Sequence, residues 1–293
     1  MKMDNVMSSL NPGAVIGGFV LVMAFLALGI LHRRNRKSNE SKSLPYPKDV
    51  VILHQGSRAP YAPSLSPFAV KLETYLRVAK IPYQNVYDKK PGSKGKIPWI
   101  EYNGVSVPDT EFCMQFLRQK RSTDINEELT PEQQATARAF QKMVDEHTYW
   151  IMILFRWIYD ETKEVINLAK WRRTYITIVT YMARMQTHYQ GLGRHTQKEV
   201  EAILDGDFKA LSQYLGDKQY FFGDSPTEVD CALFGQLSQL LWHLPHTIVP
   251  TLLQEKYPNL VDYCERIQTN YWPDWSSCIT HGDRQSDRDQ KCG

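Results

Sequence analysis

The chain has 293 residues, which is room for two modest domains, and its 42% hydrophobic and 23% charged residues are those of an ordinary globular protein. A formal net charge of +3, with basic residues scattered except in one cluster, argues against a nucleic-acid-binding surface. The 5 cysteines include no C-x-x-C pair, which argues against a disulfide framework or a zinc site and favours a reducing compartment.

The N-terminal part of the chain contains one long apolar run. After a short segment, residues 1–12, residues 13–31 form a nearly continuous apolar stretch of about the length that spans a bilayer as a helix. The one basic cluster follows directly, in a linker at residues 32–48, and the positive-inside rule places that side in the cytosol. We therefore predict an uncleaved transmembrane anchor with the rest of the chain in the cytosol. A cleaved signal peptide is the alternative, because Ala27-Leu28-Gly29 offers small residues at a suitable spacing.

The pattern of residues 49–121 predicts the order strand, helix, strand, strand, helix, which is that of a thioredoxin-like domain. The predicted strands are short apolar or alternating segments at residues 50–54, 83–87, 97–102 and 105–107. Asn103-Gly104 is typical of a two-residue hairpin turn. The first helix starts at Pro67, which suits a first turn, and the second is capped by Asp109 or Thr110.

A charged linker leads to a second, all-helical domain that we place at residues 130–272. The predicted long helical segments are residues 131–161, 163–189, 196–215 and 259–271. Thr196-x-x-Glu199 and Thr227-x-x-Asp230 predict capped helix starts. Arg156 lies inside an apolar run, so we expect it to pair with an acid from another helix. The polar segment 273–293 is predicted to be a disordered tail.

Several of these motifs together resemble a known family. A strand opened by Ile97-Pro98, a hairpin, and the acid–hydroxyl pair Asp109-Thr110 at a helix start resemble the thioredoxin-like half of glutathione transferases. The match extends over Pro63–Phe68, Lys71–Arg77, Ile81–Gln84, Lys96–Tyr102 and Thr110–Phe112. With these runs the chain resembles the failed axon connections family, and metaxins and cadmium-responsive nematode proteins look like more distant relatives. The resemblance covers roughly residues 49–275 and implies an α/β thioredoxin-like domain followed by an all-α domain.

The same resemblance implies a glutathione site. In transferases the proline is cis and the backbone before it pairs with the cysteinyl part of glutathione, while the acid–hydroxyl pair holds the γ-glutamyl end. Carried over, this implies a cleft formed by Ile97, Pro98, Asp109 and Thr110. The alternative for each is structural: Pro98 shapes the fold, and Asp109 and Thr110 merely cap a helix.

Glutathione chemistry also requires a hydroxyl or thiol near the first strand, directed at the sulfur. Ser66, directly before Pro67, occupies that place, with Ser64 and Tyr61 as alternatives. Ser66 can equally be a simple helix cap. We expect no metal cofactor, because several histidines lack carboxylate or cysteine partners at ligand spacing: His188, His195, His243 and His246.

The resemblance implies a binding or scaffold role in axon development for a membrane-anchored protein, with glutathione and either a second copy or another protein as partners. Two alternatives are open: a glutathione-dependent transferase for detoxification or metal stress, and a metaxin-like subunit of the mitochondrial outer membrane. Whether the protein is an enzyme stays open at this stage. So does the membrane, which could be the plasma membrane, the endoplasmic reticulum or the mitochondrial outer membrane.

Overall fold

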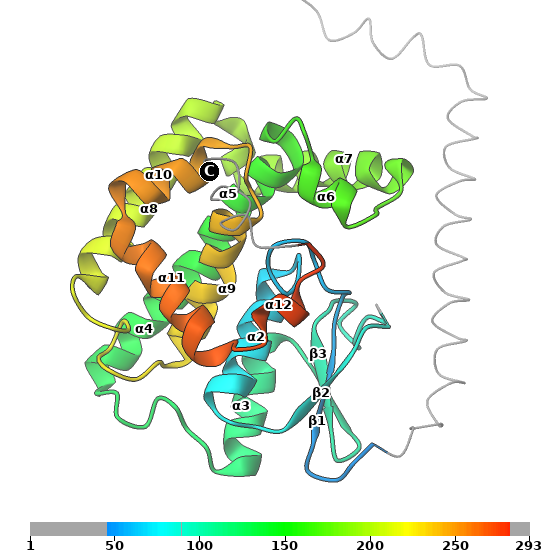
Figure 1. The fold of residues 1–293 in the computed structure, drawn as a ribbon, viewed down its shortest axis with the longest axis vertical. Helices are drawn as coiled ribbons and strands as arrows, with labels where there is room; N and C mark the ends of the chain where they lie inside the picture. Colours follow the sequence, from blue (N-terminus) through cyan, green and yellow to red (C-terminus); the bar gives the residue numbers. More distant parts are fainter. Residues whose placement is uncertain (1–45, 89, 282–293) are drawn as a thin grey trace, which may run out of the picture. The chain divides into compact units, whose positions relative to one another are not determined.

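Four short strands form a mixed sheet in the order β2-β1-β3-β4. Their bounds are Val51–His54 (β1), Tyr83–Val86 (β2), Trp99–Tyr102 (β3) and Val105–Pro108 (β4). Helices α2 (Pro67–Val78) and α3 (Thr110–Arg121) lie beside this sheet (Figure 1). The computed structural model describes residues 46–88 and 90–281, and the chain divides into two units, Met1–Pro47 and Lys48–Gly293. All of the contacts below lie within the second unit.

The local sequence explains how these strands connect. β1 and β2 are parallel, and helix α2 (Pro67–Val78) provides the crossover that parallel neighbours require. β3 and β4 form the predicted hairpin, in which Asn103 and Gly104 both have positive φ, 49° and 80°. A two-residue turn with two positive φ angles suits the strand twist, which is why Asn-Gly favours it. Helix α3 (Thr110–Arg121) completes the predicted order, which is therefore confirmed.

The rest of the described chain is helical, as predicted. Its elements are α4 (Pro131–Met143), η2 (Val144–Thr148), α5 (Tyr149–Leu154), η3 (Phe155–Tyr159), α6 (Glu164–Leu168), α7 (Arg173–Gln190), η4 (Leu192–Arg194), α8 (Gln197–Leu215), α9 (Glu228–Trp242), α10 (Ile248–Lys256), α11 (Pro258–Tyr271) and α12 (Trp275–Cys278). α4 to η3 form one continuous helical run. The segment expected to follow as a single helix is instead broken between α6 and α7, where Lys170 has a φ of 56°.

Helix α9 joins the two halves of the fold. Its residues Val229–Leu241 are all buried, because one side of α9 packs on α2 and its other sides pack on helices of the helical half. The closest approach is at Gly235, where an added Cβ would lie 2.6 Å from the carbonyl oxygen of Pro67. A buried ion pair, Lys71 Nζ to Asp145 Oδ2 at 2.5 Å, also links α2 to the helical half. The first turns of α2 are thus fixed by helices that come much later in the sequence.

Two sequence expectations were wrong. Among the described residues Arg156 pairs with no acid. Its guanidinium donates to the carbonyl oxygen of Leu65 at 2.7 Å and to the side-chain oxygen of Gln239 at 2.8 Å. Residues 273–281 are not a disordered tail, because α12 is helical and Ile279 pairs with Ala59. Apolar contacts explain the order, since Trp275 and Cys278 are buried in the main core. Residues 282–293 lie outside the described part of the chain.

The predicted anchor at residues 13–31 lies outside the described residues. Within residues 46–88 and 90–281, no helix combines the length and the apolar character that crossing a membrane requires.

Candidate functional site

The predicted site residues start from one edge of the sheet. His54, the last residue of β1, pairs with Trp99, the first residue of β3, and Trp99 pairs in turn with Pro108, the last residue of β4. Ile97-Pro98 directly precedes β3, and Asp109 directly follows β4. Because α2 runs back toward the parallel strand β2, it also begins at this edge. The fold therefore brings together segments that are far apart in the sequence.

The turn before β3 contains the cis peptide bond between Ile97 and Pro98 that the resemblance implied. Pro98 is buried, and the Ile97 side chain lies beside the loop after β1, 3.7 Å from where a Cβ on Gly56 would stand. Trp99 stacks on His54 with ring centroids 3.8 Å apart, and its indole nitrogen donates to the carbonyl oxygen of Lys90 at 2.8 Å. Burial lowers the pKa of His54, so this stacked imidazole is neutral at pH 7.

The start of α3 has an unusual backbone. Asp109 adopts φ 76° and ψ 128°, a region that a residue with a side chain rarely enters. Its Oδ1 caps the helix by accepting from the backbone N–H of Glu111 at 3.1 Å, and Thr110 is buried. Strained residues of this kind cluster at ligand-binding positions, where the surrounding structure holds them. A helix N-terminus also favours a bound carboxylate, because its first N–H groups lack partners within the helix.

The serine hydroxyls have structural partners. Ser66 caps α2, with its Oγ accepting from the backbone N–H of Ala69 at 3.4 Å. The Ser64 Oγ accepts from the backbone N–H of Ser66 at 3.2 Å. The third alternative, Tyr61, donates its hydroxyl to Glu164 at 2.7 Å. The capping interpretation of Ser66 is therefore confirmed, which by itself neither requires nor forbids a contact with a ligand thiol.

The loop that carries these residues is held by the helical half. His243 Nε2 lies 3.1 Å from the backbone nitrogen of Ala62, and Gln239 donates to the carbonyl oxygen of Ser64 at 3.1 Å. Arg156 donates to Leu65 next to them. Since Nε2 accepts a backbone N–H, the neutral His243 carries its proton on Nδ1, facing the Gln239 oxygen at 2.8 Å. Burial lowers the pKa of His243 well below 6.5 and that of Arg156 to about 10.

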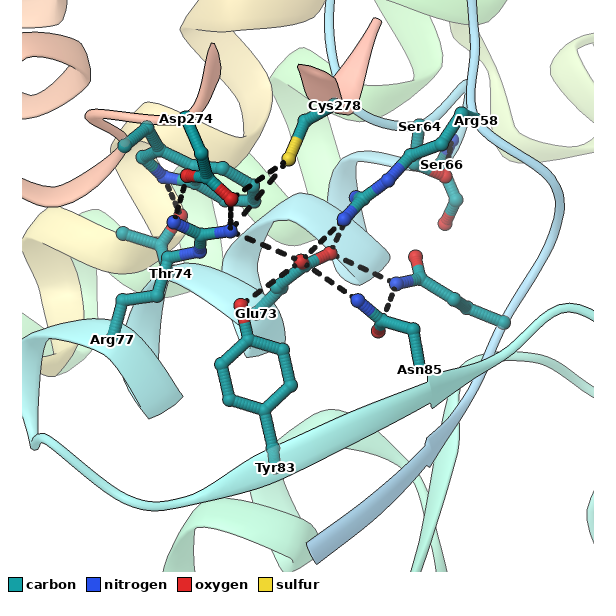
Figure 2. A network of polar contacts seen from close by, with 12 residues as sticks. Arg58, Ser64, Ser66, Glu73, Thr74, Arg77, Tyr83, Asn85, Asp274 and Cys278 are labelled. Atoms are coloured by element: carbon teal, nitrogen blue, oxygen red, sulfur yellow. Dashed lines mark hydrogen bonds and ion pairs between the residues drawn. The ribbon is translucent and has the colours of Figure 1, made fainter.

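A second network, which the sequence analysis missed, holds the first part of the same loop (Figure 2). Glu73 on α2 accepts two hydrogen bonds from Arg58, each 2.8 Å long. It accepts three further hydrogen bonds, from Gln55 at 2.8 Å, Asn85 at 3.0 Å and Tyr83 at 3.1 Å. No local sequence signal marks these partners, because they come from the loop, α2 and β2.

The C-terminal segment closes this network. Arg77 donates to both carboxylate oxygens of Asp274, at 2.5 and 3.0 Å, as Figure 2 shows. Beyond α12, the backbone N–H groups of Thr280 and His281 donate to the loop carbonyls of Ala59 and Pro60 at 2.9 and 3.1 Å. The loop between β1 and α2 is thus fixed by α2, by α9 and by the end of the described chain. Such a loop can present a rigid surface to a ligand.

Within the part of the chain that the structure describes, no three His, Cys, Asp or Glu side chains are grouped to hold a metal. The four cysteines of that part are buried, and burial raises the pKa of Cys113 to about 12 and that of Cys278 to about 11. Both thiols are therefore protonated at pH 7 and are weak nucleophiles.

Family comparisons match both halves of the fold. A profile described as Glutathione S-transferase N-terminal domain matches residues 67–162, and one described as Glutathione S-transferase, C-terminal domain matches residues 204–267. The segment 163–203, which contains α6, α7 and η4, lies between the two matches.

Individual proteins are similar over most of the chain. Failed axon connections of Drosophila melanogaster is 31% identical over 80% of this chain, although the chain spans only 61% of that protein's length. Isoprene-epoxide--glutathione S-transferase of Rhodococcus sp. (strain AD45) is 28% identical over 71% of this chain and 94% of its own length. Metaxin-2 of Mus musculus is 24% identical over 79% of this chain and 92% of its own length.

Solved structures support the fold alone, because their identities to the chain are low. The beta-etherase LigF of Sphingobium sp. strain SYK-6 aligns with a TM-score of 0.53 at 18% identity, over 75% of this chain and 95% of that chain. A glutathione S-transferase of Ceriporiopsis subvermispora, solved in complex with glutathione, aligns with a TM-score of 0.53 at 12% identity, over 75% and 97%. The architecture is that of a thioredoxin-like domain followed by a helical transferase-like domain.

Proposed function

Since the chain belongs to the glutathione-transferase-like family that includes failed axon connections and the metaxins, we propose that it is a binding protein whose ligand is glutathione. The site is the sheet edge where the cis Ile97–Pro98 turn and the start of α3 lie. The observation that carries the proposal is the strained backbone of Asp109, φ 76°, next to this turn.

The proposed contacts follow from the charges of glutathione. The ligand brings two carboxylates and one ammonium group. One carboxylate would accept from the N–H groups that open α3, near Thr110, and the Asp109 carboxylate would pair with the ammonium. The backbone before the cis Pro98 would pair with the cysteinyl residue, as in the transferases that the sequence resembles.

Calorimetry with glutathione tests this proposal. Asp109→Asn keeps the capping oxygen but removes the charge, so affinity should fall by about 5- to 100-fold, the loss expected for an unpaired ligand ammonium. Asp124→Asn is a matched control, because Asp124 accepts the backbone N–H of Asn126 at 2.9 Å in a similar turn beyond the other end of α3. Its affinity should equal that of the parent. No heat and no competition at millimolar glutathione would overturn the proposal.

A transferase is the second candidate, favoured by the similarity to the Rhodococcus enzyme and by the place of Ser66 at the start of α2. A hydroxyl that hydrogen-bonds a thiolate speeds turnover and lowers the thiol pKa. Ser66→Ala should then lower the rate with a generic electrophile and raise the pKa of bound glutathione, while the affinity changes little. An unchanged rate in Ser66→Ala would exclude this role for Ser66.

The proposal also includes the uncleaved anchor at residues 13–31, a cytosolic domain, and a scaffold role in axon development. The sequon Asn39-Glu40-Ser41 tests the topology, because it must remain unglycosylated in the cytosol. A glycosidase-sensitive mass shift that disappears in Asn39→Gln would contradict it. Staining of the full-length protein on mitochondria would instead favour the metaxin-like alternative.

A further inference from the structure

Helix α7 carries an exposed apolar stripe. Five large side chains follow one another along it at intervals of three and four residues: Tyr175, Ile178, Met182, Met185 and Tyr189. Their exposed fractions run from 38% for Met185 to 72% for Tyr189. Such intervals keep side chains on one face of a helix. Two further exposed aromatic residues adjoin the stripe, Trp171 just before the helix and Tyr181 at the edge of the stripe.

The stripe is not the face that α7 uses for folding. Ala183 and Thr187 are buried, and Ile176 and Val179 pack with Ala183 on a small cluster that contains Trp157. At 3.6 residues per turn these positions lie on a different side of α7, so the core of the protein does not explain the stripe. Isolated exposed apolar residues need no explanation, but a contiguous patch marks an interaction surface.

The stripe and its borders on α7 carry no charge. The side chains at its edges are those of Thr174, Tyr181 and Gln186. The two arginines of the helix, Arg173 and Arg184, lie about 120–160° around it from the stripe. Two copies of this face can therefore approach each other without bringing like charges together, whereas a charged partner would find no opposite charge on it.

The spacing of the stripe is suited to pairing with a second helix. Intervals of three and four residues average 3.5, which is the spacing of a seam along which two helices pack. If two copies of α7 lie antiparallel about an axis at position 180, Ile178 of each copy opposes Met182 of the other. Tyr175 opposes Met185 in the same way. The stripe is thus complementary to itself, as an interface with two-fold symmetry requires.

The size and composition of the stripe also fit a dimer interface. At their exposed fractions, the five stripe residues with Trp171 and Tyr181 present roughly 700 Å² of surface, since one aromatic side chain has about 150–250 Å². Each partner of a standard interface buries about 800 Å². Aromatic residues and methionine are enriched in the buried centre of interfaces, and charged residues are depleted there.

We propose that the outer face of α7 is an interface with a second copy of this chain, in which the two α7 helices pack antiparallel. Burial of the two stripes against each other supplies the free energy of association. The helix lies at the periphery of the helical half and in the segment between the two family matches, residues 163–203 (Figure 1). None of its residues belongs to the sheet edge proposed to bind glutathione, so the two proposals are tested independently.

Energy transfer between labelled copies of the full-length chain in phosphatidylcholine vesicles tests this interface. The four cysteines of the described residues are buried, so a thiol-reactive fluorophore is directed to Cys292. One pool of protein carries a donor and a second pool carries an acceptor, and dilution of both into more lipid measures the strength of the dimer. In the parent, the transfer should exceed that of randomly placed chains and should fall when unlabelled chain is added.

Two charged variants test the antiparallel pairing. Ile178→Glu and Met182→Lys should each weaken the dimer by about 10- to 100-fold, because each dimer then buries two unpaired charges. Both positions are exposed in the single chain, so the melting temperature should not change. When a donor pool of Ile178→Glu is mixed with an acceptor pool of Met182→Lys, the new carboxylate faces the new ammonium. Most of the transfer should then return.

The matched control is Ile248→Glu on α10, whose native residue is exposed to a similar degree, 49% against 55% for Ile178. It should dimerise like the parent. Absence of specific transfer in the parent would overturn the proposal, and the stripe would then serve a different partner. Transfer that is unchanged in both charged variants would place the dimer on another face. A loss in both without recovery in the mixture would exclude the antiparallel pairing.

Discussion

Arg58, in the loop after β1, and Glu73, on α2, form a two-pronged ion pair: Nη1 lies 2.8 Å from Oε2 and Nη2 lies 2.8 Å from Oε1. The Glu73 side chain is 1% exposed and that of Arg58 is 16% exposed. Burial alone would raise the pKa of Glu73, but the hydrogen bonds and charge of Arg58 outweigh it and hold that pKa below 4.5. The charged pair is therefore one of the contacts that hold the loop that leads to Ser66.

Replacing Glu73 tests that role. Glu73→Gln leaves the mostly buried Arg58 guanidinium without its opposite charge, so the free energy of unfolding should fall by about 3 kcal/mol. Arg138→Gln is the control, because its ion pair with Glu111 lies at the surface and should contribute less than about 1 kcal/mol. Denaturant unfolding of the three proteins measures both effects. Equal losses in the two variants would contradict the assigned importance of the buried network.

The buried His243 predicts a stability that depends on pH. Burial lowers the pKa of His243 in the folded chain well below 6.5. As the pH falls through 6.5, the unfolded chain therefore binds a proton on this imidazole while the folded chain keeps it neutral. The stability that the neutral His243 contributes to the folded state is therefore fully present above pH 6.5 and is lost progressively as the pH falls below that value. The melting temperature of the parent should drop between about pH 7 and pH 5.

His243→Gln keeps an acceptor for the loop N–H groups but cannot take up a proton. Its melting temperature at neutral pH should be lower than that of the parent, and its dependence on pH should be shallower. Some dependence should persist, since burial also lowers the pKa of His54. Identical slopes in the parent and the variant would show that His243 does not control stability in this range.

Gly235 predicts an unusual response to alanine. An alanine in a helix normally stabilises by about 0.5–1 kcal/mol relative to glycine. Here its Cβ would lie 2.6 Å from the carbonyl oxygen of Pro67 and 3.1 Å from Lys71, so α9 would be forced away from α2. Gly235→Ala should therefore destabilise by about 1–3 kcal/mol. Gly206→Ala on α8, where nothing lies within 4 Å, should stabilise instead. A stabilising Gly235→Ala would contradict the close packing.

The start of α9 predicts unequal effects for its two capping residues. The backbone N–H and the hydroxyl of Thr227 both donate to Asp230 at 2.8 Å, so Thr227→Ala should cost about 1 kcal/mol. Asp230 also accepts from the backbone N–H of Phe221 and from the hydroxyl of Tyr263, each at 3.0 Å. Asp230→Ala would leave these buried donors unpaired and should cost more, about 3 kcal/mol or above. Equal losses in the free energy of unfolding for the two variants, measured by chemical unfolding, would contradict the central role of Asp230.

Features whose partners are a few residues apart could be predicted from the amino-acid sequence. Asn103-Gly104 makes the hairpin, because positive φ angles are easy for this pair. Pro67 starts a helix, and the Thr196 side chain caps α8 by accepting from Glu199. Each of these depends on backbone geometry and short-range hydrogen bonds, so the local pattern was sufficient to predict it.

The contacts that support the candidate site join segments far apart in the chain, so they could be seen only in the folded structure. Arg156 donates a hydrogen bond to Leu65, ninety-one residues away. No local pattern could show that the acceptor of this hydrogen bond is a backbone carbonyl and not an acid. The pairing of Ile279 with Ala59 orders a segment whose polar composition had indicated disorder. In both cases the free energy comes from burial and hydrogen bonds that exist only once distant segments meet. Composition and periodicity contain no record of such contacts, so the loop that carries Ser66 acquires its shape only in the folded chain.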